Sequence, residues 1–436
     1  MLRGVAVLAL LGATAAADPL SDLLAKTPEI ARAVSKQRGL PLKRPIPNEV
    51  LDKDAMRARL LKETADPKAA REATESGQLM IRFGLLPAGT DYTAMMVDVL
   101  TEQIAGFYDP DTKALAVATS AGEDETWAEV VLSHELDHGI QDQNFDLKKF
   151  EDVPDGESDA DMARHALVEG DGVALMLEVL VGKTGGAIDW SNPALVAALT
   201  SAMSEPDDDK PGPGGKSEKL DKAPLAVREA MLFPYRAGLV FVAGLRAHHS
   251  WRAVDAAFRR APRSTEQILH VAKYLADEKP IVVGKDLPAS LHDYPLVTTS
   301  VMGELGYSIW FRAHGVDEAP ANTAAAGWGG DRTLLFAATG ETRPDHMIGL
   351  ARSAWDTEAD AIEAEAAAAH ALDASALGAI VEKDDTHARF VTADGTTSWV
   401  ERRGKQLVVV IGAPAAIAPA LADDAWVGLP KAKRHR

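Results

Sequence analysis

The amino-acid sequence predicts an α+β fold in which helices predominate. Three features support this prediction: mostly helical patterns up to about residue 304, one turn-forming quartet between two short apolar runs, and a C-terminal part that mixes an Ala-rich helix with Val-rich runs. With 436 residues, the chain is longer than a single hydrophobic core of about 250–300 residues, so we expect several domains.

The N-terminal residues have the layout of a secretory signal peptide. Arg3 gives a positive start, an apolar run of about ten residues follows at 4–13, and three alanines precede Asp18. An uncleaved anchor is the alternative, but the run is shorter than the roughly 20 apolar residues that span a bilayer. We therefore expect cleavage after residue 17, export to the periplasm or the extracellular space, and no membrane span afterwards.

A β-hairpin is predicted ahead of the central helices. Asp109-Pro110-Asp111-Thr112 favours a turn and lies between Phe107-Tyr108 and the apolar run 113–119. Helices are expected at 52–63, 90–105, 126–141 and 158–180, and the third opens with a capping box of Thr126 and Glu129.

The C-terminal part changes in character. Residues 358–372 predict an Ala-rich helix, 388–391 and 407–411 predict strands, and the glycines of Gly327-Trp328-Gly329-Gly330 predict a turn anchored by a buried Trp. We divide the chain into six segments: a signal peptide at 1–17, an N-terminal mixed region at 18–89, a central core at 90–203, a flexible linker or loop at 204–222, a helical region at 223–310, and a C-terminal α/β region at 311–436.

The composition excludes several classes of function. The chain has 46 Lys+Arg against 65 Asp+Glu and a net charge of −19, which argues against nucleic acid or anionic lipid as a partner. It has no cysteine, which excludes disulfides, thiol nucleophiles and thiolate metal ligands. Any bound metal must therefore be held by His, Asp or Glu.

The segment His134-Glu135-Leu136-Asp137-His138 is an HExxH motif on a predicted helix. A spacing of four residues puts both imidazoles on one helix face, where both can reach the same Zn²⁺. Glu135 lies beside that face and can accept a proton from a metal-activated water. The alternative is an amphipathic helix with two structural histidines.

A catalytic zinc needs a third protein ligand and an open fourth position. Glu169 is the strongest candidate, because it lies in an apolar helix where an unpaired carboxylate would be expensive. Gly170 and Gly172 weaken that helix, and a close approach to another helix would account for them. His165 lies one turn earlier and could replace Glu169 as a ligand, although a supporting or packing role is favoured.

Four further residues are weaker candidates. Asp161 and Asp171 could hold a ligand imidazole by its second N–H group. Tyr235 and His270 could stabilise the oxyanion of a tetrahedral intermediate, although core packing is the more usual role of such residues.

From 90 to 181 the chain resembles the gluzincin branch of HExxH zinc metallopeptidases, whose third ligand is a Glu on a following helix. The chain is also similar to a group of poorly characterised exported bacterial proteins. The similar segments are 134–147, Leu167-Val168-Glu169-Gly170-Asp171, Phe233-Pro234-Tyr235, 264–270 and 327–331. The resemblance implies a zincin-like core at 90–203, zinc on His134, His138 and Glu169, and Glu135 as the base. It also implies that the strand at 114–118 pairs with the backbone of a peptide substrate.

The sequence therefore predicts an exported metalloprotease with one catalytic Zn²⁺ and a peptide or protein substrate. Two alternatives stay open: a zinc-stabilised binding or scaffold protein without turnover, and an enzyme that hydrolyses another amide or an ester at the same centre.

Overall fold

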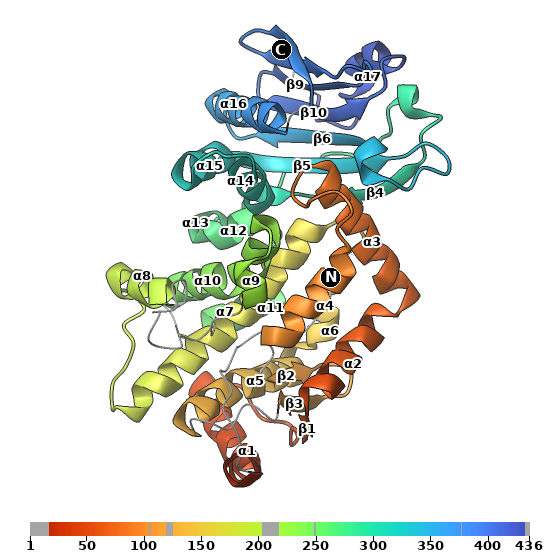
Figure 1. Ribbon diagram of the computed structural model, residues 1–436. Helices are drawn as coiled ribbons and strands as arrows, with labels where there is room; N and C mark the ends of the chain where they lie inside the picture. Colours follow the sequence, from red (N-terminus) through yellow and green to blue (C-terminus); the bar gives the residue numbers. More distant parts are fainter. Residues whose placement is uncertain are drawn as a thin grey trace.

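The structure is a computed structural model that describes residues 17–103, 106–118, 125–202, 218–247, 250–375 and 377–431. It confirms a mixed α+β fold in which helices predominate (Figure 1). The predicted signal peptide lies outside the described residues except for Ala17, and so does most of the predicted linker. Within the described ranges, no helix is both long and apolar enough to cross a membrane.

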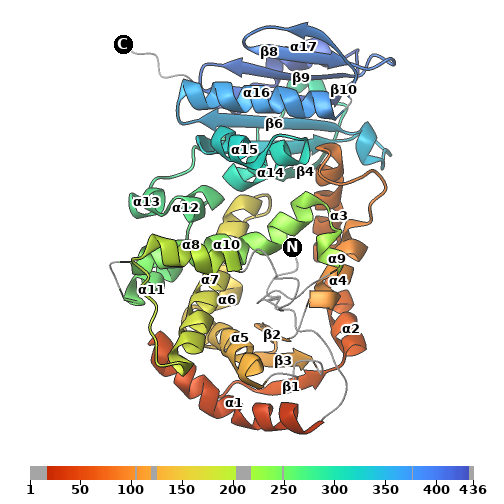
Figure 2. The same cartoon turned by 60° about the vertical axis from the view of Figure 1, so that its left-hand side comes forward.

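The chain forms a helical part and a C-terminal part that lie one above the other in Figures 1 and 2. The helical part contains α1 (Ala17–Arg38), β1 (Asn48–Leu51), α2 (Lys53–Thr64), α3 (Pro67–Arg82), α4 (Tyr92–Gln103), β2 (Gly106–Asp109), β3 (Ala114–Ala118), α5 (Glu125–Phe145), α6 (Leu147–Phe150), α7 (Ser158–Lys183), α8 (Pro193–Ala202), α9 (Glu218–Asp221), α10 (Leu225–Arg246), α11 (Arg252–Arg259), α12 (Thr265–Leu269) and α13 (Val271–Leu275). The C-terminal part contains η2 (Ala289–Leu291), β4 (Leu296–Ser300), α14 (Gly303–Ala313), α15 (Glu318–Ala325), β5 (Trp328–Phe336), η3 (Pro344–His346), β6 (Ile348–Trp355), α16 (Glu358–Ala374), β7 (Ala379–Lys383), β8 (His387–Val391), β9 (Thr397–Arg403), β10 (Gln406–Ala413) and α17 (Ala418–Asp424).

A small sheet lies beside α5 and has the strand order β1-β3-β2. The predicted hairpin is confirmed, since β2 and β3 pair antiparallel around the turn. β1 pairs with the other side of β3 in parallel, which the sequence did not predict. The expectation that 114–118 pairs with a peptide substrate is therefore wrong, because both sides of β3 are already paired and the edge strands of this sheet are β1 and β2.

Two long helices cross at a pair of glycines. A Cβ atom on Gly170 of α7 would lie 2.2 Å from the carbonyl carbon and oxygen of Gly238 on α10. The close approach that the sequence indicated for Gly170 is thus confirmed. It brings α7 into the apolar core around Leu167, Leu239 and Val242, which fixes the helix that carries Glu169.

The N-terminal segment packs on the HExxH helix in a second apolar cluster. Ile30 and Val34 of α1 pack in one cluster with Leu132, Leu136 and Ile140 of α5. Together with β1, this packing joins the segment 17–51 to the elements that surround the HExxH motif (Figure 2).

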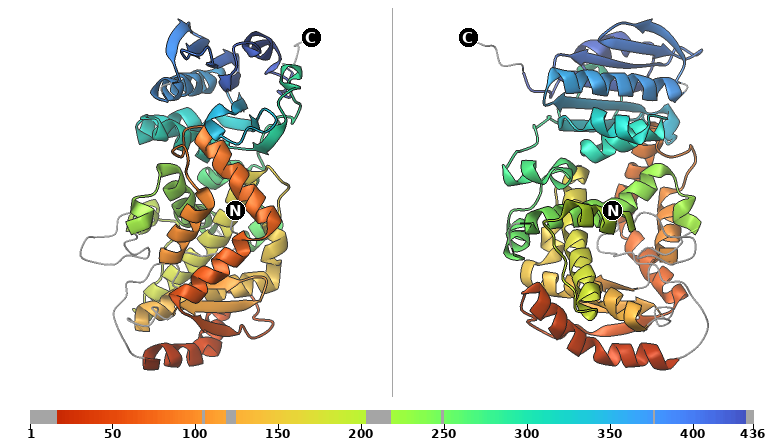
Figure 3. Two further views of the ribbon diagram at one scale, coloured as in Figure 1. Left: turned by 45° about the vertical axis from the view of Figure 1, so that its right-hand side comes forward. Right: turned by 90° about the vertical axis from the view of Figure 1, so that its left-hand side faces the viewer.

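The C-terminal part is built on a seven-stranded sheet with the order β4-β5-β6-β10-β9-β8-β7. Helices α14, α15 and α16 pack on one face and α17 packs on the other (Figure 3). The predicted helix at 358–372 and the strands at 388–391 and 407–411 are present. The proposed boundary at residue 310 falls inside α14, and β4 joins the sheet from the region that was expected to be helical.

The turn predicted at Gly327-Trp328-Gly329-Gly330 is not formed, because β5 begins at Trp328. Trp328 is buried as expected, but the glycines serve a close approach of two chain segments. A Cβ on Gly330 would lie 2.0 Å from the carbonyl oxygen of Ile281, whose N–H donates to the carbonyl of Gly329 at 2.6 Å.

Replacing Gly170 by Ala should destabilise the protein by about 2 kcal/mol or more, because the added methyl group has no space against the Gly238 backbone. The matched control is Gly182→Ala near the end of the same helix, where a Cβ meets nothing within 4 Å. That change should raise stability by about 0.5–1 kcal/mol through helix propensity. Urea unfolding of both variants measures the difference, and equal stabilities would contradict the close helix crossing.

Candidate metal centre

Three side chains that the sequence singled out converge in the interior between α5 and α7. The Nε2 atoms of His134 and His138 lie 3.0 Å apart, and Glu169 Oε2 lies 3.2 Å from the first and 3.5 Å from the second. All three residues are buried. The spacing of His134 and His138 on α5 and the crossing of α7 over that face produce this arrangement.

The distances fit a tetrahedral zinc site. Ligand atoms at 2.0–2.1 Å from a tetrahedral centre lie about 3.3–3.4 Å from one another, close to the separations observed for His134, His138 and Glu169. The chemistry of the set is also suitable, since two imidazole nitrogens and one carboxylate oxygen are common zinc ligands. Within the described ranges, this group has three such residues, which leaves a fourth position open.

The buried carboxylate of Glu169 favours a positive charge between the three candidate ligands. Burial opposes the protonation of His138, but Glu169 outweighs burial and raises the pKa of His138 to about 10. Burial also disfavours the ionised form of Glu169, yet His138 and His134 hold the pKa of that carboxyl well below its usual range. The carboxylate thus demands a positive charge beside it, which a proton or a metal dication can supply.

Glu135 lies next to the ligands and keeps one oxygen available. Its Oε2 accepts a hydrogen bond of 3.0 Å from the backbone N–H of Tyr108 in β2. Its Oε1 is buried and makes no hydrogen bond among the described residues. Burial raises the pKa of Glu135 to about 8, and a nearby dication would lower it again.

His138 is held from behind by Gln141 and not, as predicted, by Asp171. The Nδ1 atom of His138 lies 3.0 Å from Gln141 Oε1, and Asp171 accepts a hydrogen bond from the Gln141 amide at 3.0 Å. Asp171 also accepts from Arg38 at 2.7 and 3.0 Å, and Arg38 donates to Asp255 at 2.8 Å. Asp171 was predicted to contact His138 directly, whereas Gln141 lies between the two side chains and bonds to both.

His134 is held by packing. A Cβ on Gly172 would lie 2.8 Å from the Nδ1 and Cε1 atoms of this ring, so only glycine fits at that position of α7. The ring of Tyr235 on α10 stacks beside His134 at a centroid distance of 6.3 Å. Tyr235 is buried in the apolar core, and its ring packs beside the candidate ligand His134.

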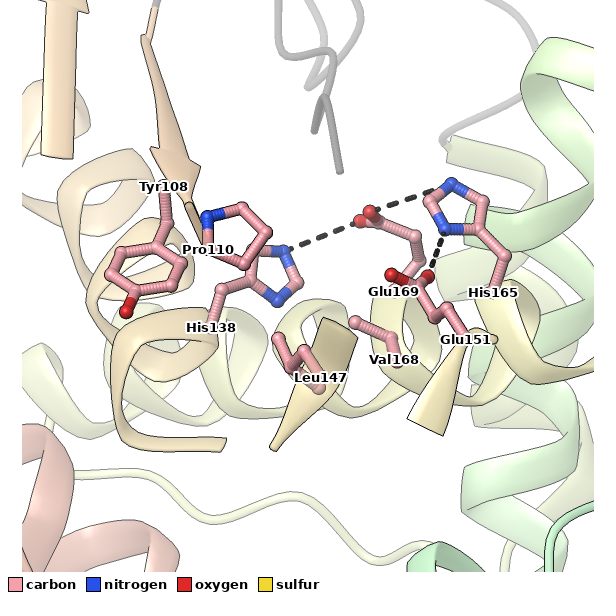
Figure 4. A pocket seen from close by; sticks show the side chains of 8 residues that line it. All are labelled: Tyr108, Pro110, His138, Leu147, Glu151, His165, Val168 and Glu169. Atoms are coloured by element: carbon pink, nitrogen blue, oxygen red, sulfur yellow. Dashed lines mark hydrogen bonds and ion pairs between the residues drawn. The ribbon is translucent and has the colours of Figure 1, made fainter. Parts of the chain in front are cut away.

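A small pocket opens beside the cluster (Figure 4). Tyr108, Pro110 and His138 lie on one side of it and Glu169, His165 and Glu151 on the other, and Leu147 and Val168 complete the lining. His165 Nε2 lies 3.7 Å from Glu169 Oε1, the oxygen that points away from the two ligand histidines, and His165 Nδ1 lies 3.0 Å from Glu151. His165 is thus a neighbour of Glu169, on the face that the sequence spacing predicted.

His270 does not join this site. It ends α12 and pairs with Glu304 at 2.9 Å, and it is not among the residues that line the pocket. The role in oxyanion stabilisation predicted for His270 is therefore not supported by its position.

A second group of acidic side chains in the described ranges consists of Glu266, Glu278 and Asp356. Its centre is filled by the ammonium group of Lys273, which lies 2.6, 3.1 and 2.6 Å from the three carboxylates. A lysine thus supplies the charge that a metal would bring, so this group is an ion-pair network.

Sequence reasoning missed Gln141, Arg38 and Glu151. Gln141 lies three residues after His138, a helical spacing that could have indicated the contact. Arg38 and Glu151 come from other elements, and nothing in the local sequence pattern indicates which side chain they meet.

Comparison with known proteins adds information on the C-terminal part alone. Residues 294–422 match the family model of a domain of unknown function, DUF8575. The matched range runs from just before β4 into α17 and leaves out the candidate metal centre. No curated protein and no solved structure matches the chain.

Replacing Arg38 by Met should lower the free energy of unfolding by about 3–5 kcal/mol, because the buried carboxylate of Asp171 loses its bidentate partner. The control is Arg32→Met on the exposed side of α1, which should change stability by at most about 0.5 kcal/mol. Chemical denaturation of both variants makes the comparison. Similar losses in the two would argue that the Arg38 network contributes nothing specific.

Proposed function

We propose that the protein is an exported zinc-dependent metalloprotease of the gluzincin type, which hydrolyses peptide bonds in a peptide or protein substrate. One observation carries the proposal: three ligand atoms converge within 3.0–3.5 Å of one another, beside a buried glutamate with an available oxygen. The order of hairpin, HExxH helix and glutamate helix along the chain supports the gluzincin assignment.

Two features favour a catalytic site over a structural one. A structural zinc usually has four protein ligands, whereas this group offers three within the described ranges. The ligands His138 and Glu169 also line a small pocket, which has room for a water molecule beside them. A scaffold without turnover would have no use for the available oxygen of Glu135.

The roles of the side chains follow from their positions. His134, His138 and Glu169 would hold the zinc ion through Nε2, Nε2 and Oε2. A zinc ion held there would supply Lewis acidity, which would polarise the scissile carbonyl and lower the pKa of a bound water toward about 7. Glu135 accepts the proton of the attacking water and passes it to the leaving amine, while the Tyr108 N–H fixes the other oxygen of its carboxylate.

The first test is the zinc content of the purified protein and of Glu169→Ala. The wild type should hold one zinc per molecule, and the variant should bind it at least about 100-fold more weakly, since one of the three direct ligands is lost. The control is Glu129→Ala on α5, which removes only an ion pair with Lys183 at 2.7 Å and should keep the zinc. Full zinc binding by Glu169→Ala would move the third ligand to another residue, and absence of zinc from the loaded wild type would refute the metal centre.

The second test replaces Glu135 by Gln. The variant should bind zinc like the wild type and should cleave an unfolded protein at least about 100-fold more slowly, because it cannot accept a proton. Cleavage by the wild type should stop when a chelator is added and return with zinc. Undiminished cleavage by Glu135→Gln would rule out this mechanism.

A further inference from the structure

We infer that Gln141 is the positioning residue that orients His138 toward the metal, an inference that rests on the proposed zinc site. HExxH motifs supply the ligands, but each imidazole must also present the correct nitrogen to the ion. In this chain a glutamine on the same helix, buried and one turn after His138, supplies that control.

The surroundings of Gln141 allow only one orientation of its amide. The Nε2 atom lies 3.0 Å from Asp137 Oδ2, 3.0 Å from Asp171 Oδ2 and 3.3 Å from the carbonyl oxygen of Val168. Carboxylate and carbonyl oxygens accept hydrogen bonds, so they require the NH₂ group on this side. The Gln141 oxygen must therefore face His138.

This orientation decides which nitrogen of His138 carries a proton. An amide oxygen only accepts, so the Nδ1 atom at 3.0 Å must donate an N–H to Gln141 Oε1. In the neutral imidazole, the lone pair is then on Nε2, the atom that faces His134 and Glu169. Gln141 thus selects the tautomer that can bind a metal between the three ligands.

The amide is itself held in place by a buried cation. Arg38 donates two hydrogen bonds to Asp171, at 2.7 and 3.0 Å, and this fixes the carboxylate that accepts from Gln141. The side chains of Arg38 and Asp171 are both fully buried, so water does not compete for these bonds. A chain of hydrogen bonds therefore runs from α1 through α7 to the back of a zinc ligand.

The ring of His134 is positioned differently: it packs into the space left by the missing side chain of Gly172 and beside Tyr235, and its Nδ1 atom makes no hydrogen bond among the described residues. The two ligands thus differ in how they are oriented. A change at Gln141 should act on His138 and spare His134.

The test compares two substitutions at the same position. Gln141→Met removes both the acceptor and the donors and should weaken zinc binding 10–100-fold, measured by competition with a chromogenic chelator. In Gln141→Glu, burial beside the carboxylates of Asp137 and Asp171 favours the neutral acid, whose O–H group donates in place of the amide NH₂ while its other oxygen still accepts from Nδ1. This variant should hold zinc within about threefold of the wild type. Gln143→Met on the same helix is the control, because Gln143 bonds only to the exposed segment at Lys43 and Arg44 and its loss should leave the affinity unchanged.

A second readout separates positioning from simple support of the fold. In the zinc-loaded wild type, the imidazole N–H proton of His138 should give a slowly exchanging resonance in the NMR spectrum, and Gln141→Met should lose that protection while the fold, followed by circular dichroism, is kept. If Gln141→Met does not fold, the inference depends on Gln141→Glu holding zinc as expected.

Three results would overturn the inference: equal zinc affinity in the wild type and Gln141→Met, equal weakening in Gln141→Met and Gln141→Glu, or an unprotected His138 N–H in the wild type. Each requires a wild type that binds zinc, so each is distinct from failure of the proposed function. A wild type that binds no zinc refutes the metal centre and this inference together.

Discussion

The fold depends on the burial of carboxylates along one helix. α7 carries Glu169 and Asp171 into an apolar core, where an unpaired charge would be expensive. Each carboxylate is satisfied from a different direction: Glu169 by the histidines of α5, and Asp171 by Arg38 of α1 and Gln141 of α5. The need to place these partners around α7 determines how α1 and α5 pack.

The C-terminal part is attached to the same helix at its N-terminal end. Arg332 of β5 donates to the carbonyl of Gly156 and to Glu157, both at 2.8 Å, just before α7 begins. The hydroxyl of Ser158, the first residue of α7, also hydrogen-bonds to the hydroxyl of Ser300 at the end of β4 and to the carbonyl of Val301. The sheet that matches the domain of unknown function thus contacts the first residue of the helix that carries Glu169, although it lies apart from the candidate metal centre (Figure 1).

Local patterns in the sequence were sufficient to predict the hairpin, the two long helices around the HExxH motif, and the ligand face of each. They also indicated that Gly170 permits a close contact. A glycine inside a helix lowers stability, so its presence in a buried helix suggests that another chain segment packs where a side chain would lie. What they could not provide were pairings between distant segments. Three such pairings join residues that lie from about 35 to more than 130 positions apart in the sequence. They are the parallel pairing of β1 with β3, the pairing of β4 with β5, and the contact of Arg38 with Asp171.

The errors have the same physical origin. The glycines around Trp328 were interpreted as a turn because glycine favours turns, whereas here they admit the backbone of Ile281. Asp171 was placed beside a ligand because carboxylates often hold metal-binding histidines, whereas Gln141 stands between them. In both cases the residue type was informative, but the partner was decided by tertiary packing.

The burial of Arg38 has a consequence for how the chain can mature. In this protein, a cut after residue 38 would take away the cation that balances Asp171, together with the α1 side chains that pack on the HExxH helix. A cut after residue 51 would also remove β1 from the small sheet. The segment 18–51 thus packs into the surroundings of the candidate metal centre, and its release would remove contacts that support the HExxH helix and Asp171.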